Sequence, residues 1–428
     1  FLRGQTAPFF LRQINMETGS IVADFSLPTG SRIFYPHQFL DVRQRLGHFL
    51  PSAGAANCFG VSLLDRGVVW QRVTSAAIPT NSAPWIGPTS PRSCVFRSRN
   101  RLLALDPTDG KLLWERTDLE EVPRPLNNLT AIPGDDEAIL LVEPDELKSY
   151  RVYKRDDGSV LREGRLKNCT FVHDHFGRNL LYDVTENAQQ NRGIRLWDPL
   201  TDQTLFEYHN PKPMSSILLS QMSNSMLQPE SEGEFAIAEA TGRVRVIDGR
   251  TGKVNLDVEL GEGSIRGAPA LRLFSDATRY YLNVQYSPAG VGMPTLYAET
   301  MFQTHQVMGD LYAFDRRTSE RLWVRKNLPT QSIVQLADYR LPFLVSLNRT
   351  GRPNRVNNSI GLKLEVIDGQ TGQTLGIHTN ALNDRLFLMD YDRDGGRLRF
   401  RGSVTQLQIN FGREINKGLR DVDDLVTR

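Results

Sequence analysis

The chain has 428 residues, 51 Lys and Arg against 49 Asp and Glu, and 39% hydrophobic residues. This composition is typical of a folded globular protein and excludes the disordered and collagen-like classes. The net charge of +2 gives no electrostatic basis for nucleic acid as a partner. No apolar run reaches the roughly 18 residues of a membrane-spanning helix, so we expect no transmembrane segment.

The chain begins at Phe1 without a methionine or a charged-then-apolar leader. We therefore expect a mature or excised part of a longer polypeptide or complex, whose targeting segment lies elsewhere.

Further along, residues 37–50 carry Phe39, Leu40, Leu46 and Phe49 at roughly helical spacing, which predicts a short helix.

A hairpin pattern recurs along the chain and is clearest from Ala104 to Trp114. One strand ends at Asp106, whose carboxylate can accept hydrogen bonds from backbone amides two residues on, and Gly110 supplies the positive φ of the last corner. A second strand follows and reaches Trp114. Taking Ala104 as position zero, the other copies are anchored at Gln13, Leu63, Val152, Leu196, Val246, Ala313 and Val366.

These eight anchors recur about every 50 residues, and further strand-like runs lie between them, for example 138–142, 179–184, 234–239 and 280–286. Four short strands at such a period predict a β-propeller. We expect an all-β, eight-bladed propeller of four-stranded antiparallel blades over residues 1–411, followed by a tail, 412–428. The last blade would close the ring by joining the first hairpin to strands at 385–390 and 397–401, which removes an exposed sheet edge. A competing count takes the turn at 390–396 as a ninth hairpin.

The Asp, Gly and Trp positions from Ala104 to Trp114, echoed from Ala313 to Trp323, resemble the repeat of the pyrroloquinoline-quinone-like (PQQ-like) β-propellers. That superfamily includes quinoprotein dehydrogenases and BamB-like assembly lipoproteins. The resemblance implies that Trp70, Trp114 and Trp323 dock against a neighbouring blade. Other repeats depart from the pattern at this position, with Ala23, Arg162, Phe206, Leu256 and Gly376. A WD40 propeller is the alternative, but its Trp-Asp pair occurs once, at Trp197.

The same resemblance would place adjacent cysteines and a calcium ion beside the quinone of a quinoprotein enzyme. Here Cys58, Cys94 and Cys169 lie far apart in sequence. This argues against PQQ as a cofactor, and we expect no catalytic residues. The alternative is a quinoprotein-type oxidoreductase or a small-ligand-binding propeller that uses the central channel, whose lining residues cannot be identified from the sequence.

Two clusters resemble metal sites. Asp390, Asp392 and Asp394 match the opening of a calcium-binding loop, but Arg401 occupies the twelfth position, where a bidentate Glu belongs. An Asp-rich turn is the alternative.

His173 and His175 would share one strand face, as two metal ligands require, although no third ligand lies nearby, which favours solvent-facing histidines.

Long segments at 29–52, 75–92, 210–233, 287–309 and 348–360 all fall between middle strands or between blades, and so on one face. Residues 287–309 offer Tyr297, Met301 and Phe302, with Met293, Leu296 and Met308, as an apolar partner-binding surface, unless they fold back as a lid. Arg349, Arg352 and Arg355 would grip carboxylates or phosphates, unless that loop is merely solvated.

We therefore expect a non-catalytic scaffold that presents a loop-rich face to a protein partner. The resemblance to BamB-like proteins implies a role in cell-envelope assembly and a periplasmic, secreted or envelope-associated location.

Overall fold

The computed structural model describes residues 10–14, 21–26, 40–41, 46–49, 57–62, 67–73, 85–89, 92–98, 100–119, 132–143, 149–185, 192–209, 218–221, 233–239, 241–261, 264–265, 270–285, 303–335, 342–350, 361–380, 388–392, 397–401, 406–410 and 426–427. Within these ranges the fold is all-β, and none of them forms a helix. The chain divides into two compact units, one of Phe1–Met214 with Gly249–Lys253 and one of Ser215–Asp248 with Val254–Arg428.

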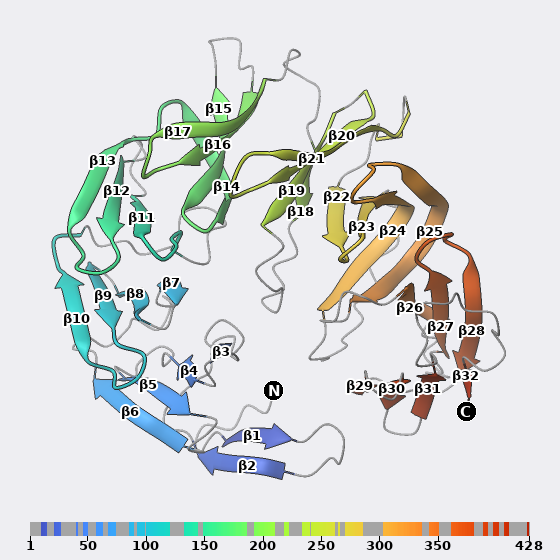
Figure 1. Cartoon of the computed structure of the whole chain (residues 1–428), viewed down its shortest axis with the longest axis horizontal. Helices are drawn as coiled ribbons and strands as arrows, with labels where there is room; N and C mark the ends of the chain where they lie inside the picture. Colours follow the sequence, from blue (N-terminus) through green and yellow to red (C-terminus); the bar gives the residue numbers. More distant parts are fainter. Residues whose placement is uncertain are drawn as a thin grey trace, which may run out of the picture. The chain divides into compact units, whose positions relative to one another are not determined.

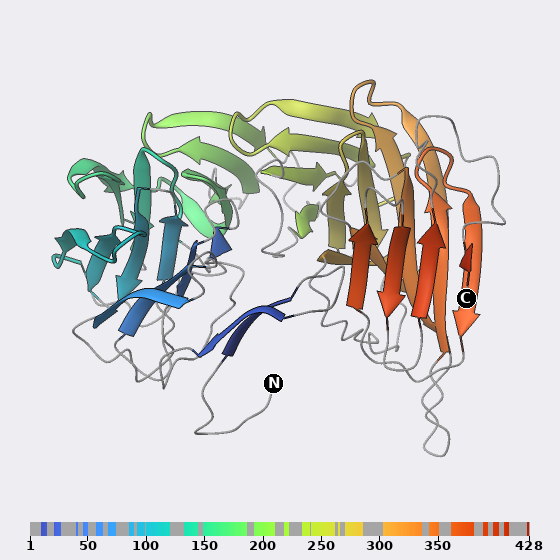
Figure 2. The same cartoon turned by 60° about the horizontal axis from the view of Figure 1, so that its bottom comes forward.

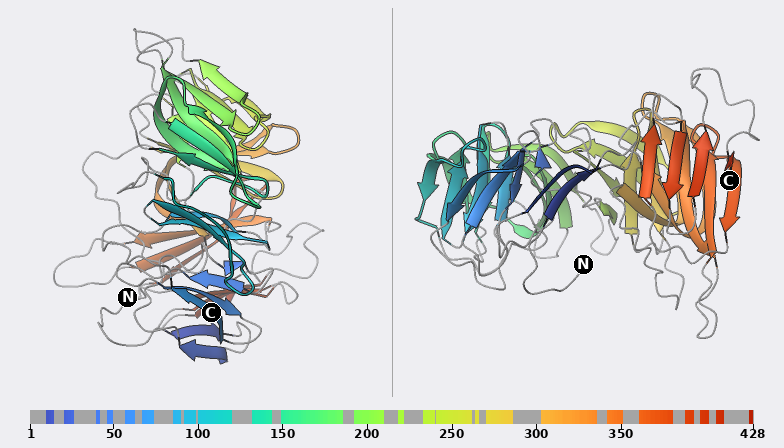
Figure 3. Two further views of the ribbon diagram at one scale, coloured as in Figure 1. Left: turned by 90° about the vertical axis from the view of Figure 1, so that its left-hand side faces the viewer. Right: turned by 90° about the horizontal axis from the view of Figure 1, so that it is seen from below.

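The first unit contains five antiparallel sheets (Figures 1 and 2). The first two are β1 (Phe10–Ile14) with β2 (Ile21–Ser26), and β3 (Leu40–Asp41), β4 (Leu46–Phe49), β5 (Asn57–Ser62) and β6 (Gly67–Val73). The next two are β7 (Trp85–Thr89), β8 (Cys94–Ser98), β9 (Arg101–Leu105) and β10 (Leu112–Arg116), then β11 (Ala138–Val142), β12 (Ser149–Lys154) and β13 (Val160–Arg165). The fifth, drawn in green at the top of the left panel of Figure 3, is β14 (Cys169–Phe176), β15 (Asn179–Thr185), β16 (Arg192–Asp198) and β17 (Gln203–His209).

The second unit contains one sheet of 11 strands and one of four. The large sheet comprises β18 (Leu218–Gln221), β19 (Glu234–Ala238), β20 (Arg243–Asp248), β21 (Val254–Glu259), β22 (Ala270–Ser275), β23 (Arg279–Gln285), β24 (Gln303–Asp315), β25 (Arg321–Gln335), β26 (Phe343–Thr350), β27 (Gly361–Asp368) and β28 (Thr374–Asn380). The small sheet comprises β29 (Leu388–Asp392), β30 (Arg397–Arg401), β31 (Gln406–Asn410) and β32 (Val426–Thr427).

All eight predicted hairpins are present, as β1–β2, β5–β6, β9–β10, β12–β13, β16–β17, β20–β21, β24–β25 and β27–β28. The best-matched turn follows the expected chemistry: Asp106 Oδ1 accepts the amide of Thr108 at 2.8 Å, and Gly110 has a φ of 70°. The strands predicted between hairpins, such as β11 and β15, are also found. Local turn chemistry therefore decides where the chain reverses.

All eight hairpins carry a β-bulge at the same place, one residue before the Trp position. In β9–β10, for example, Leu112 pairs with Leu105 and Trp114 with Ala104, which leaves Leu113 as the extra residue. Because a bulge increases the local twist, it turns the Trp position toward the next hairpin. The bulge residues Val69, Leu113 and Leu161 are among the exposed large hydrophobic residues.

Two of the eight last corners carry a residue other than glycine in the left-handed conformation, Asp202 at φ 60° and Ser319 at φ 62°. A Cβ makes this conformation costly. We expect Ser319→Gly to raise the free energy of unfolding by about 0.5–1 kcal/mol, since glycine relieves the strain at some entropic cost. Chemical denaturation measures the change. Ser319→Ala is the control and should give no gain, because alanine keeps both the Cβ and the strain.

The turn carboxylates make the hairpins sensitive to acid. Asp157 Oδ1 accepts hydrogen bonds from the amide and the hydroxyl of Ser159, at 2.9 and 2.6 Å, and these lower its pKa from 3.8 to about 2. Because the folded-state pKa lies below the unfolded one, this turn contributes stability above about pH 4 that is lost as the pH falls toward 2. An NMR titration of Asp157 should show the low pKa. Its apparent pKa should return toward 3.8 in Ser159→Ala, which removes the hydroxyl donor, and an equal pKa in both proteins would contradict this cause.

The predicted helix at 37–50 is wrong: this segment contains β3 and β4, and β4 pairs with β5 from Leu46 opposite Ser62 to Phe49 opposite Phe59. Short apolar runs are ambiguous between helix and strand, and an available strand partner decides the outcome.

The predicted composite last blade also differs from the structure. Among the described strands, β1 and β2 pair only with each other, whereas β29 and β30 continue into β31 and β32. β31 begins only a few residues after β30, so this local pairing closes a short loop at low entropic cost. β32 lies within the expected tail.

The strands β18–β28 do not separate into individual four-stranded sheets. β18 pairs in parallel with β22, and the C-terminal part of β25 pairs with β26. β24 and β25 are long enough for this, at 13 and 15 residues, and bulges around Gly309 interrupt their register. The buried side chain of Asn283 satisfies the disturbed backbone, donating to the carbonyl oxygens of Met308 and Asp310 at 3.0 Å each.

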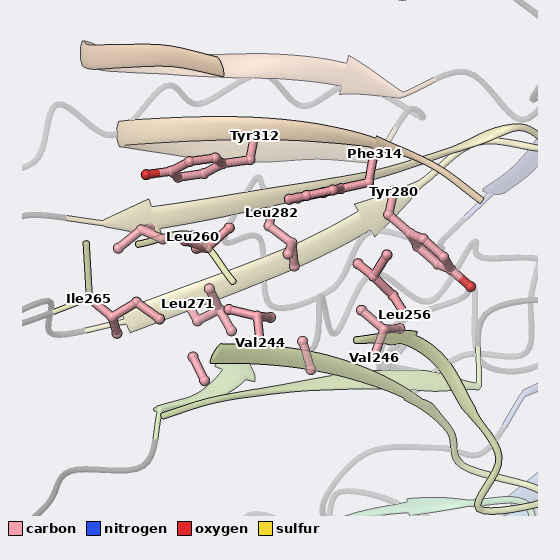
Figure 4. Close-up of a cluster of buried hydrophobic side chains, with 13 residues drawn as sticks. Val244, Val246, Leu256, Leu260, Ile265, Leu271, Tyr280, Leu282, Tyr312 and Phe314 are labelled. Atoms are coloured by element: carbon pink, nitrogen blue, oxygen red, sulfur yellow. The ribbon is translucent and has the colours of Figure 1, made fainter. Parts of the chain in front are cut away.

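One core cluster of the second unit packs side chains of β19–β21 against those of β22–β24. Figure 4 shows Tyr280 and Leu282 of β23 and Phe314 of β24 on one side, facing Val244 and Val246 of β20. Each of these side chains is at most 2% exposed. Alternation along the strands directs these residues to one face, so burial of that face joins neighbouring hairpins.

Candidate functional site

Tryptophan joins successive hairpins in the way that the resemblance implied. Trp114 Nε1 donates to the carbonyl oxygen of Arg155 in the next hairpin turn at 2.7 Å, and its ring covers Gly158, where a Cβ would lie 2.6 Å from the ring. Trp70 makes the same contacts with Pro107 and Gly110. The Trp at the end of one hairpin therefore packs against the Gly of the next turn. We call this contact between two successive hairpins a joint.

In the second unit, Trp323 repeats this joint with the carbonyl oxygen of Gly369 at 2.9 Å and with Gly372. All three tryptophans are buried. The prediction that Trp70, Trp114 and Trp323 dock against the next hairpin is confirmed.

An arginine locks the joint around Trp114. The Arg155 side chain is buried, and it donates five hydrogen bonds, to Ser93 Oγ, the carbonyl oxygens of Ser93, Pro88 and Asp135, and Asp136 Oδ1. Its guanidinium thus ties the β12–β13 turn to Pro88 in β7 and to Ser93, which directly precedes β8. Sequence patterns gave no sign of this role, because its partners lie up to 67 residues away.

Cys94, next to Ser93 in sequence, packs in the hydrophobic cluster that contains Trp70, and burial raises the pKa of its thiol to about 12. Since the thiolate is the reactive form, we expect Cys94 to resist labelling by a disulfide reagent at pH 8 in the native protein and to react fully after denaturation. Mass spectrometry of the labelled peptides measures this. Rapid native labelling of Cys94 would contradict its burial.

The joint after β13 has a different chemistry. Arg162 stands where other repeats have Trp, and its Nη1 lies 2.9 Å from Oδ2 of Asp202, which stands where other turns have Gly. This ion pair is partly exposed. An exposed pair contributes at most about 1 kcal/mol, so β13 is held more weakly than β10, which carries the buried Trp114.

The structure describes only part of the expected site residues. Asp390 and Asp392 lie in β29, and Arg349 lies in β26 opposite Leu362 of β27. Residues Tyr297, Met301, Phe302, Met293, Leu296, Arg352, Arg355 and Asp394 lie outside the described residues. Met308 differs from the expectation: it is a buried residue of β24, because that strand already begins at Gln303.

The two histidines of β14 do not share a face as expected, because a bulge at His173 shifts the strand register. His173 Nε2 lies 2.6 Å from Asp183 Oδ1, whereas His175 Nδ1 lies 3.3 Å from the carbonyl oxygen of Gly177. Burial lowers the pKa of His175 and raises the pKa of Asp174. Within the described ranges, no three His, Cys, Asp or Glu residues are placed to hold a metal ion.

The cysteines do not form the adjacent pair of a quinoprotein site. Cys94 and Cys169 are free thiols in β8 and β14, and Cys58 lies in β5. No described segment is a helix long and apolar enough to span a membrane.

Several solved structures resemble the chain at low identity. BamB from Moraxella catarrhalis is 14% identical, with 84% of this chain and 92% of that chain covered and a TM-score of 0.36. A europium-containing methanol dehydrogenase is 10% identical, with 83% and 80% covered and a TM-score of 0.35. The C-terminal WD40 domain of Sif2 is 11% identical, with 85% and 91% covered and a TM-score of 0.36. No curated protein matches the sequence.

A family model described as outer membrane protein assembly factor BamB matches residues 60–349, which is well over half of the chain. The matched range runs from β5 to β26 and contains the Trp70, Trp114 and Trp323 joints. The chain therefore belongs to the BamB family of PQQ-like repeat proteins.

Proposed function

We propose that the protein is a non-catalytic scaffold that binds a protein partner during assembly of the cell envelope, in the periplasm or at the outer membrane. One observation carries this proposal: the match over residues 60–349 to a family named for outer membrane protein assembly. We take the eight hairpins as the outer halves of eight blades of one propeller, in which the long segments between middle strands and between blades would open on one face.

The joints support a scaffold role. Buried Trp–Gly contacts and the five hydrogen bonds of Arg155 hold neighbouring hairpins in fixed relation within each unit. Loops displayed on a rigid support lose little conformational entropy on binding, which favours association. We propose Tyr297, Met301 and Phe302, and separately Arg349, Arg352 and Arg355, as partner contacts, with no resident PQQ. Calcium at Asp390, Asp392 and Asp394 would stiffen that turn.

The partner hypothesis can be tested by cross-linking in the organism that encodes the protein. The tagged full chain should cross-link to an outer-membrane protein or its assembly machinery, as identified by mass spectrometry. A variant with residues 287–302 replaced by a Gly-Ser linker should lose this partner. The replacement stops at 302 because Val307 and Met308 are buried strand residues. A linker of matched composition in place of 351–358 tests the arginine loop separately.

Retained cross-linking by both loop variants would overturn the loop assignments, and the absence of any envelope partner would overturn the proposed function. The enzymatic alternative has its own measurement: the purified chain mixed with PQQ and Ca²⁺ should gain neither visible absorbance nor dye-reducing activity. Gaining either would favour the quinoprotein-type oxidoreductase.

A further inference from the structure

We propose that β13 is a docking edge at which an extended, acidic segment of a protein partner adds as a further strand to the β11–β13 sheet. This inference rests on the proposed function as a protein-binding scaffold and names a second contact site, away from the loops. It is carried by the exposure of β13, its free backbone edge and its unbalanced positive charge.

β13 is exposed along its length, a property that it shares with β28 but not with β10, β17 or β21. None of its six residues is buried, and Val160 and Leu161 are 40% and 45% exposed. By contrast, β10, β17 and β21 each bury at least one side chain, Trp114, Tyr208 and Leu256 respectively. β13 also contributes no side chain to the hydrophobic core clusters of the described residues.

One backbone edge of β13 has no strand partner in the part of the chain that the structure describes. Figure 1 shows β13 as the last strand of its sheet, and among the described strands it pairs only with β12. From Arg162 to Arg165 the pairing with β12 is regular, so alternate amide and carbonyl groups of β13 point away from the sheet. Such an edge offers main-chain hydrogen bonds to an extended peptide, and the neighbouring side chains select its sequence.

The charges on β13 indicate which peptide would bind. Charged residues usually discourage pairing at an edge, but two of those here are already paired, Arg162 with Asp202 at 2.9 Å and Glu163 with Arg151 at 3.8 Å. Arg165 and the following Lys167 are exposed and have no ion-pair partner among the described residues. The unbalanced charge is therefore positive, which favours a segment with acidic side chains and with apolar residues opposite Val160 and Leu161.

The probe is a fluorescein-labelled decapeptide of alternating valine and glutamate, titrated into the full chain and followed by fluorescence anisotropy. We expect Arg165→Glu with Lys167→Glu to weaken binding about tenfold, since attraction at two positions becomes repulsion. A peptide with lysine in place of glutamate should show the opposite preference. Lys253→Glu with Lys326→Glu is the matched control, because both lysines are exposed and lie outside β13, and it should leave binding unchanged.

Two measurements identify strand addition itself. N-methylation of alternate peptide amides should abolish binding, since it removes the main-chain donors. Hydrogen exchange should show new protection of the amides of 160–165 in the complex. The inference is overturned if N-methylation leaves peptide binding unchanged, if the two charge-reversed proteins bind the peptide equally, or if the amides of β13 gain no protection. So does dimerisation of the free chain through β13, detected by sedimentation.

Each of these failures leaves the cross-linking result for the envelope partner intact, so it is distinguishable from failure of the proposed function. If instead no envelope partner is found but the peptide still binds at β13, the docking edge stands and the proposed role in envelope assembly fails.

Discussion

Replacing Trp114 with alanine is expected to lower the free energy of unfolding of the first compact unit by about 3–5 kcal/mol, because a buried aromatic side chain leaves a cavity when it is truncated. The substitution also removes the donor to the Arg155 carbonyl oxygen and uncovers Gly158. Urea denaturation followed by far-ultraviolet circular dichroism measures the change without relying on tryptophan fluorescence.

Leu113 provides the matched control for Trp114. It is the neighbouring bulge residue and is 43% exposed, so Leu113→Ala should change stability by only about 0.5 kcal/mol. Trp114→Phe should fall between the two, because it keeps an aromatic ring but loses the indole donor. If Trp114→Ala lowered the free energy of unfolding no more than Leu113→Ala does, the contact of Trp114 with the next hairpin would not stabilise the unit.

Arg155→Met is expected to destabilise the same unit by about 3–5 kcal/mol, as measured by the same denaturation. The substitution removes five hydrogen bonds and leaves the carbonyl oxygens of Pro88, Ser93 and Asp135 without their donor. Buried acceptors that lose a charged partner bear the full cost of desolvation.

Arg162→Met is the control for Arg155→Met, since both arginines belong to the same hairpin but Arg162 makes a partly exposed ion pair. It should cost at most about 1 kcal/mol. Equal effects of the two substitutions would mean that the buried hydrogen-bond network is no stronger than a surface ion pair. Hydrogen exchange on Arg155→Met should show the largest loss of protection in β7 and β8, which the guanidinium holds.

The joints between successive hairpins differ in their chemistry along the chain. Trp70, Trp114 and Trp323 each bind the carbonyl oxygen and cover the glycine of the following turn. Arg162 and Asp202 replace this pair by an exposed ion pair. Because Arg162 stands where other repeats have a buried Trp, β13 has no buried side chain. We propose that a partner uses this exposure of β13.

The eight hairpins and their turns could be predicted from the residue types, because the interactions that shape them are local. The carboxylate of Asp106 and the positive φ of Gly110 act within five residues, so the residue types predict the turn wherever it occurs. The Trp positions followed from the same register, and the positions that depart from it, such as Arg162 and Asp202, were visible as well.

Which distant groups these residues contact became known from the folded chain alone. Arg155 reaches Pro88 and Ser93, β4 pairs with β5 where a helix was expected, and β30 continues into β31 and not toward the first hairpin. Strand partners and buried polar partners are chosen by packing and chain connectivity over long sequence separations, and no local pattern encodes that choice. The exposure of β13 is also decided by packing. Its residues predict an ordinary strand, and the arrangement of the described strands around it leaves its outer edge without a strand partner.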